Sequence, residues 1–204
     1  MKMKIMIALG ICLNSFLGLT QDNGNFIVII NGDSIHIDLD TTVQHKPASG
    51  NELTIKVIQP QFLTYSDQMI TFKYDKSLSV SDTKVNDDIE QCMVMKSTGN
   101  GFLVQKYKTI DPSSLTQLML SERTKESVNY GYKKKEKKFK KKLISGHTIE
   151  GIQATLSYKG EEQIYTVATY GDKDEGILVV TMLLNQDFND TKLINDFLNS
   201  LEIK

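Results

Sequence analysis

Tryptophan is absent from this sequence of 204 residues, and cysteine, proline and histidine are scarce, with two, three and three residues. The three histidines, His36, His45 and His147, lie far apart and show no ligand spacing, so we predict no metal site. The aromatic residues are not interleaved with arginine, as they are in proteins that stack on nucleic-acid bases. The formal net charge is only −1. These absences argue against a metalloenzyme and against a nucleic-acid-binding protein.

No group of residues predicts a catalytic or cofactor site. The serine pair at 113–114 lacks the Gly-rich turn of an activated nucleophile. The acidic run at 172–175 lacks the alternating oxygen donors and the distal glutamate of a calcium loop, so we interpret it as a solvated turn. The sequon at 189–191 lies where the last helix needs an N-cap, and capping by Asn189 or Asp190 explains it. We therefore expect a protein that is not an enzyme and holds no cofactor.

The first twenty residues have the pattern of a secretory signal peptide. Two lysines in the first four residues precede the apolar run 5–19, and small residues occupy the −3 and −1 positions before Gln21. We predict cleavage of residues 1–20, with an uncleaved anchor as the alternative, although the apolar run is short for a spanning helix. The expected mature protein is exported to the periplasm or the extracellular space.

The two cysteines are compatible with an exported protein, and neither predicts a lipidation, disulfide or catalytic site. Cys12 lies inside the predicted signal peptide and follows Ile11, whereas a lipoprotein signal requires a small residue there, so we do not expect lipidation. Cys92 is then the one cysteine of the mature chain, and an internal disulfide is excluded. We interpret Cys92 as a small buried residue of a strand.

Residues 21–60 carry the pattern of a small β-unit. Asn31-Gly32 separates two apolar runs, and this dipeptide favours a two-residue hairpin turn because both residues tolerate positive φ. Three strands alone are marginal in stability, so we expect the unit to pack on residues 61–204 or to belong to the same sheet. The expected strands are 25–30, 34–39 and 53–57, with a polar connection at 40–51.

The apolar run Gly176–Leu184 is the stretch around which residues 61–204 are organised. A strand with one solvated face alternates apolar and polar residues, and this run does not. Both of its faces are therefore expected to be covered. The predicted faces are Leu178, Val180 and Met182 on one side, and Ile177, Val179 and Leu183 on the other.

Two helices are predicted to cover the sheet. The first begins at Asp111-Pro112, a good N-cap followed by a residue suited to the first turn, and ends before Gly131. The second carries a helical apolar stripe, made of Leu193, Ile194, Phe197, Leu198 and Leu201. The remaining expected strands, all antiparallel, are 69–74, 78–80, 90–96, 102–107, 149–158 and 162–170.

This order of elements resembles the Mog1/PsbP-like fold. The residues that carry the resemblance are 70–74, 195–201 and the strand–Gly–strand pattern of 151–180, and it covers 61–204. The resemblance implies an α+β domain, a predominantly antiparallel sheet between two helices in an α/β/α sandwich. Members of that fold class are mostly non-catalytic subunits of membrane complexes, partners of small GTPases or envelope proteins. No functional residue carries over, because the sequence contains no matching site motif.

One run of lysines indicates a partner. It could bind an anionic surface such as phospholipid headgroups or polysaccharide. Alternatively, it is a solvated edge strand whose charges prevent association between sheets. Nucleic acid is disfavoured by the predicted export. The eight lysines are Lys133, Lys134, Lys135, Lys137, Lys138, Lys140, Lys141 and Lys142.

From the sequence we therefore expect a non-enzymatic exported envelope protein that binds another protein or an anionic membrane surface. The binding surface would be a sheet edge, the N-terminal β-unit or the lysine run. The alternative is a carrier for a small apolar ligand in a cavity between sheet and helix.

Overall fold

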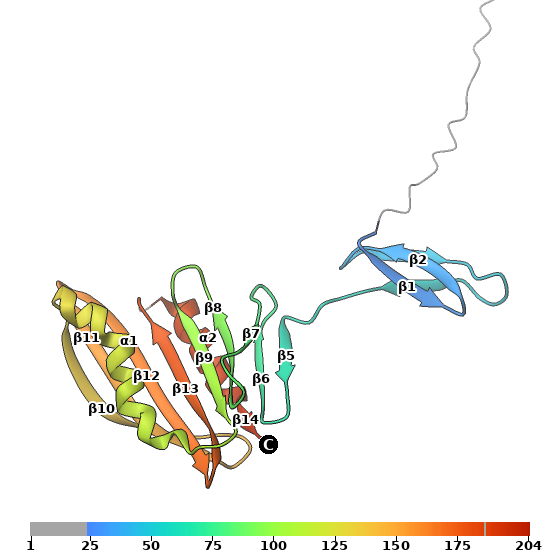
Figure 1. Ribbon diagram of the computed structural model, residues 1–204. Helices are drawn as coiled ribbons and strands as arrows, with labels where there is room; N and C mark the ends of the chain where they lie inside the picture. The colour runs from blue at the N-terminus through green and yellow to red at the C-terminus, as the bar shows by residue number, and fades with distance from the viewer. Residues whose placement is uncertain (1–23, 186) are drawn as a thin grey trace, which may run out of the picture. The chain divides into compact units, whose positions relative to one another are not determined.

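A computed structural model describes residues 24–185 and 187–204 (Figure 1). The predicted signal peptide and Cys12 lie outside the described residues. The chain divides into two compact units, with the boundary between Gln59 and Pro60, and each unit is described by itself. None of the described helices is long and apolar enough to cross a membrane.

The N-terminal unit consists of two antiparallel hairpins. β1 (Phe26–Ile30) pairs with β2 (Asp33–Ile37), and β3 (Thr42–His45) pairs with β4 (Leu53–Lys56). The turn between β1 and β2 has φ angles of 51° and 96° at its two residues, as predicted for Asn-Gly. β3 corrects the sequence prediction, which placed a polar connection there. Its short sequence, TVQH, has no apolar alternation to mark a strand.

The hydrophobic core of this unit is thin. Among its described residues, the buried apolar side chains are those of Ile35 and Ile37, both on β2. Phe26, Ile27 and Ile29 of β1 are exposed instead. The apolar residues of β1 therefore contribute little to the core of the unit that contains them.

The second unit contains a seven-stranded antiparallel sheet with strand order β10-β11-β12-β13-β9-β8-β7. A three-stranded sheet, β14-β6-β5, accompanies it. The strands of the large sheet are β7 (Ser81–Lys84), β8 (Ile89–Met95), β9 (Gly101–Tyr107), β10 (Lys133–Lys142), β11 (Thr148–Tyr158), β12 (Glu161–Asp172) and β13 (Glu175–Leu183). Those of the small sheet are β5 (Phe62–Ser66), β6 (Ile70–Asp75) and β14 (Glu202–Ile203).

Four short segments of this unit differ from the sequence prediction, and among them are β7 and β14, which were not predicted. The structure has no strand at 78–80, where Leu78 and Val80 instead pack against the core beside β7. β5 was not predicted. Its five residues pair with β6, and none of its side chains is fully buried. All four errors concern short segments, for which tertiary packing outweighs local pattern.

β13 lies at the centre of the large sheet, as the continuous apolar run predicts. Its two faces contribute to two separate cores. Leu178, Val180 and Met182 share a cluster with Leu120 of the first helix. Ile177 and Val179 share the other cluster with Phe197 of the second helix, and Leu183 is also buried. The predicted assignment of both faces is confirmed.

The helices begin and end largely as predicted, with one correction. A 3₁₀ turn (Pro112–Leu115) capped by Asp111 leads into α1 (Thr116–Tyr130), which ends at Gly131 with φ of 119°. α2 spans Phe188–Ser200, and its N-cap is Asp187. The prediction of Asn189 or Asp190 as the cap is therefore wrong.

Each helix packs on its own face of the large sheet. α1 contacts the cluster that contains Leu178, whereas α2 and the small sheet contact the opposite cluster. Phe72 of β6 contacts the rings of both Phe102 and Phe197, with centroids 5.3 and 5.4 Å away. The domain is thus α+β, with a mainly antiparallel sheet and two helices (Figure 1).

Candidate functional site

All eight predicted lysines lie on β10, which we call the lysine strand. It forms one edge of the large sheet and pairs with β11 alone (Figure 1). Because side chains alternate along a strand, the lysines form two rows on opposite faces. Row A consists of Lys133, Lys135, Lys137 and Lys141, and row B consists of Lys134, Lys138, Lys140 and Lys142.

The register with β11 assigns each row to a face. Residues directly opposite one another in an antiparallel pair share a face. Row B is opposite Ile152 and Leu156, which belong to the α1 side of the sheet. Row A is opposite Ile149 of the α2 side, and further along the strand opposite Gln153 and Thr155, which are half-buried and uncharged.

The two rows differ in their counter-charges. In row B, Lys134 lies 2.8 Å from Glu136 and Lys140 lies 2.5 Å from Glu150. Within the described part of the chain, no carboxylate forms an ion pair with row A. Lys141 donates a hydrogen bond of 2.6 Å to the neutral side chain of Asn199 on α2. Row A therefore carries four uncompensated positive charges on one strand.

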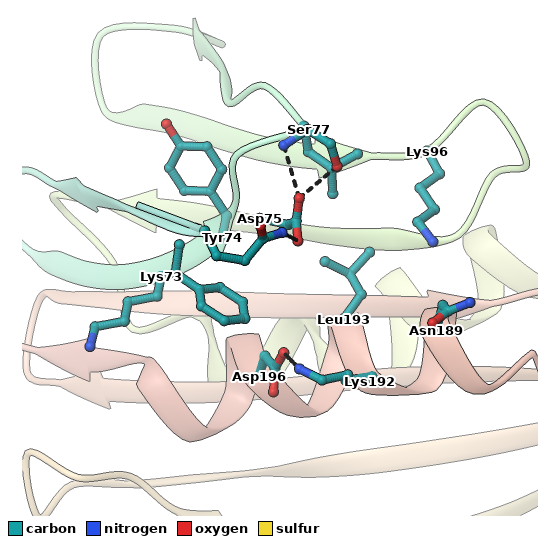
Figure 2. A pocket seen from close by; sticks show the side chains of 12 residues that line it. Lys73, Tyr74, Asp75, Ser77, Lys96, Asn189, Lys192, Leu193 and Asp196 are labelled. Carbon is teal, nitrogen blue, oxygen red and sulfur yellow. Dashed lines mark hydrogen bonds and ion pairs between the residues drawn. The ribbon is translucent and has the colours of Figure 1, made fainter. Parts of the chain in front are cut away.

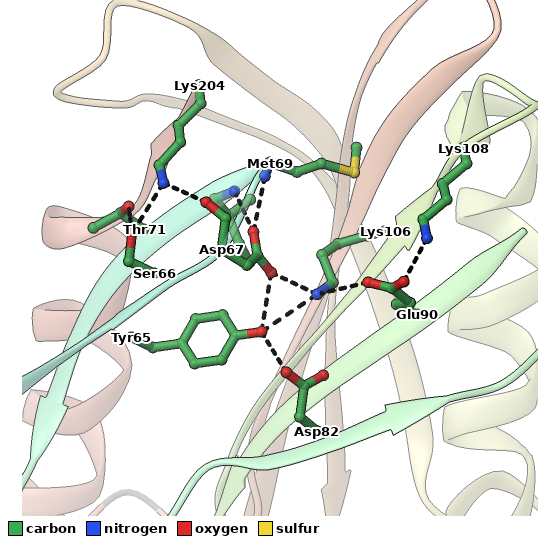
Figure 3. Close-up of polar contacts among 11 residues, drawn as sticks. Tyr65, Ser66, Asp67, Met69, Thr71, Asp82, Glu90, Lys106, Lys108 and Lys204 are labelled. Carbon is green, nitrogen blue, oxygen red and sulfur yellow. Dashed lines mark hydrogen bonds and ion pairs between the residues drawn. The ribbon is translucent and has the colours of Figure 1, made fainter.

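A second polar cluster surrounds Lys106 of β9 (Figure 3). Its side chain is 2% exposed and its Nζ lies 2.5 Å from Asp67, 3.3 Å from the Tyr65 hydroxyl and 3.4 Å from Glu90. The Tyr65 hydroxyl in turn lies 2.6 Å from Asp82. An ammonium group has three N–H donors, and here each has an acceptor. The cluster is therefore complete without a ligand, and it fastens the β5–β6 hairpin to the large sheet.

The pKa values in this cluster agree with a structural role. Burial and the hydrogen bonds to Asp82 and Asp67 raise the pKa of Tyr65, which keeps the phenol protonated as a donor. Burial alone would raise the pKa of Asp67, but the hydrogen bonds from Lys106 and the backbone hold it below its ordinary value. Nearby, burial raises the pKa of Cys92 to about 12, so this buried thiol is protonated and unreactive.

A pocket of about 560 Å³ lies between the β5–β6 hairpin and α2 (Figure 2). Nine of its twelve lining residues are polar or charged, although much of the wall surface is formed by their apolar parts and by Phe62, Leu78 and Leu193. Lys192 forms an ion pair with Asp196, and Asp75 accepts hydrogen bonds from Ser77 and Gln61. The wall thus combines apolar surface with charged groups that already have protein partners, and it does not select an apolar ligand over a polar one. The lining residues are Gln61, Phe62, Lys73, Tyr74, Asp75, Ser77, Leu78, Lys96, Asn189, Lys192, Leu193 and Asp196.

A third network was missed by sequence reasoning. Asp190 is buried in the first turn of α2, where its carboxylate accepts hydrogen bonds from Lys96 and Asn100. Asn100 also accepts a hydrogen bond of 2.5 Å from the backbone N–H of Leu184. These partners are far apart in sequence, and an aspartate near a helix start is typical of a cap. The network anchors the beginning of α2 to the sheet.

The histidines are distributed over both units, His36 and His45 in the first and His147 in the second. Among the described residues, no group of three or more His, Cys, Asp or Glu side chains is arranged to hold a metal ion. No known family model and no curated protein matches the sequence. The lysine strand is thus the arrangement of described residues that most clearly calls for a partner.

Proposed function

We propose that this protein is a non-enzymatic, exported module that binds an anionic membrane surface through the lysine strand. The observation that carries the proposal is row A, four lysines without counter-charge on an edge strand. The layered domain with one helix on each face also supports the resemblance to the Mog1/PsbP-like sandwich, whose members are mostly non-catalytic.

The strand geometry suits a charged surface. Successive lysines of one row are separated by about 7 Å, because each residue of a strand advances by about 3.4 Å. Each lysine near an anionic membrane contributes about 1 kcal/mol. The β10–β11 pairing holds the backbone of the row in place, so little additional order is required on binding.

The residue type also favours lipid headgroups over other anions. The strand contains no arginine, whose planar fork recognises phosphate with two parallel hydrogen bonds. Lysine acts as a point charge and suits a diffuse surface of headgroups. The predicted export disfavours nucleic acid as the partner.

Vesicle co-sedimentation tests the proposal. The purified protein should pellet with anionic vesicles at low salt, and binding should fall steeply as salt screens the charges. It should not pellet with neutral vesicles. Equal pelleting with both lipids, or with neither, would contradict the proposal.

A matched pair of variants tests the location of the binding surface. Replacing Lys133, Lys135 and Lys137 by glutamine removes about 3 kcal/mol, which corresponds to a loss of about 100-fold in affinity. The control replaces Lys76, Lys125 and Lys173, which are exposed lysines outside the strand. Both variants change the net charge equally, so equal losses would show that net charge, and not row A, determines binding.

A further inference from the structure

β1 carries exposed apolar side chains that are not part of the core of its unit. Its sequence, FIVII, has no charged residue. The side chain exposures of Phe26, Ile27 and Ile29 are 43%, 59% and 70%. Ile27 and Ile29 lie on one face of the hairpin, and Phe26 lies on the other face with Ile35 and Ile37. Apolar side chains exposed at the surface of a soluble unit mark interaction sites.

The backbone of β1 is also open along the edge that faces away from β2. The two-residue turn at Asn31-Gly32 makes the adjacent pair, Ile30 and Asp33, a hydrogen-bonded pair. Because such pairs alternate along an antiparallel ladder, Ile27 and Ile29 direct their N–H and C=O groups away from β2. Within the described residues, no hydrogen bond outside the β1–β2 ladder engages β1.

The unit gains stability if this edge is covered. Its described residues bury only two apolar side chains, those of Ile35 and Ile37. Two hairpins with so small a core are marginal in water. A strand added at the edge of β1 would supply both backbone hydrogen bonds and apolar contact area.

We propose that β1 pairs edge to edge with β1 of a second copy of this chain. The strands are antiparallel around a two-fold axis at Val28, so that Ile27 lies opposite the partner's Ile29. Each such pair exchanges two backbone hydrogen bonds. Phe26 then lies opposite the partner's Ile30, and every facing pair is apolar.

A second copy fits this edge for reasons of symmetry and charge. Residues equally distant from Val28 are apolar on both sides, so the strand is complementary to itself in the antiparallel direction. The strand carries no charge that would repel its own copy. The lysine strand cannot pair in this way, because eight ammonium groups would face eight others.

Oligomeric state and charge pairing test the proposal. Sedimentation velocity of the purified protein at micromolar concentrations should show a dimer. The variants I27K/I29K and I27E/I29E should each be monomeric, because like charges face one another across the two-fold axis. Mixing the two variants should restore the dimer, since each introduced lysine then faces an introduced glutamate. This rescue also shows that both variants are folded.

The control is I144K, which places a lysine at an equally exposed isoleucine of the other unit and should remain dimeric. A monomeric wild-type protein at every concentration would overturn the proposal. A dimer that persists in both charged variants, or a mixture that stays monomeric, would also overturn it. Capture of a different protein by β1 of a monomeric chain would assign the edge to that protein instead.

Discussion

β1 and β10 are both strands paired on one side only, yet they differ in nearly every other respect. β10 carries eight lysines in ten residues, whereas β1 carries five apolar residues and no charge. β10 borders a sheet whose two faces are covered by separate cores, and β1 belongs to a unit with two buried apolar side chains. A well-packed domain tolerates a charged edge that excludes other strands. A thinly packed unit benefits from an edge that admits one.

The largest difference is expected from core substitutions in the two units. Phe197→Ala should cost the second unit about 4 kcal/mol, because it empties a fully buried ring position. Ile37→Ala should cost about 3 kcal/mol, and in the first unit this removes one of two buried apolar side chains. Hydrogen exchange should therefore show β1 and β2 unprotected in Ile37→Ala while β13 keeps its protection.

The matched control is Ile144→Ala, at an exposed position where we expect less than about 0.5 kcal/mol. If Ile37→Ala leaves the protection of β1 and β2 unchanged, the first unit has a source of stability other than its small core.

A smaller effect is expected at the ion cluster that joins the small sheet to the large one. Lys106→Met should destabilise the second unit by about 2 kcal/mol, because Asp67 and Glu90 lose a shared partner while remaining partly exposed to water. The folded-state pKa of Asp67 lies below its ordinary value of 3.8. Its contribution is thus present above pH 3.8 and is lost as the pH falls through the folded pKa.

Chemical denaturation at neutral and acidic pH should therefore show a smaller acid-dependent loss of stability in Lys106→Met than in the wild type. Lys84→Met is the control, because Lys84 pairs with Asp87 in an ion pair whose two side chains are both largely exposed. An unchanged acid dependence in Lys106→Met would show that the pKa of Asp67 is set by its hydrogen bonds from the backbone and from Tyr65.

The smallest effect is expected from substitutions that remove charge from the β10 edge and so make it more like the uncharged β1 edge. Five lysines of β10 have no hydrogen-bond or ion-pair partner among the described residues, and replacing them by threonine should allow slow self-association through that edge. The domain itself should stay folded, because these side chains are not buried in its core. The five are Lys133, Lys135, Lys137, Lys138 and Lys142. Light scattering at low salt measures the association, and scattering equal to that of the wild type would show that the lysines do not protect the edge.

The sequence predicted the elements whose signals are local. The unbroken apolarity of Gly176–Leu184 identified the central strand, because only a strand covered on both faces has no polar positions. The apolar stripe of α2 and the Asn31-Gly32 turn are equally local, and both are confirmed. The lysine run could be located in the sequence, but which of its lysines have a carboxylate partner depends on Glu150 and the β10–β11 register.

Contacts between distant segments escaped prediction. In the sequence, Lys106 has the pattern of a solvated strand residue, whereas its burial depends on Asp67 from another hairpin. Asp190 was predicted as a helix cap, and it instead pairs with Lys96 across the fold while Asp187 makes the cap. Each of these residues has a partner that no local pattern indicates.

The strand order of the large sheet also determines how the second unit can fold. β7, β8 and β9 pair in the order of the chain, as do β10, β11, β12 and β13, so both groups can form through short turns. Within this sheet, the pairing of β9 with β13 is different, because it joins distant residues such as Val104 and Val179. Closing so long a loop costs chain entropy, and this cost is offset only after the contacts of the core have formed. The pairing of β9 with β13 is therefore expected to be slow. Until β9 pairs with β13, the apolar residues of β13 can associate with non-native segments or with other chains during folding.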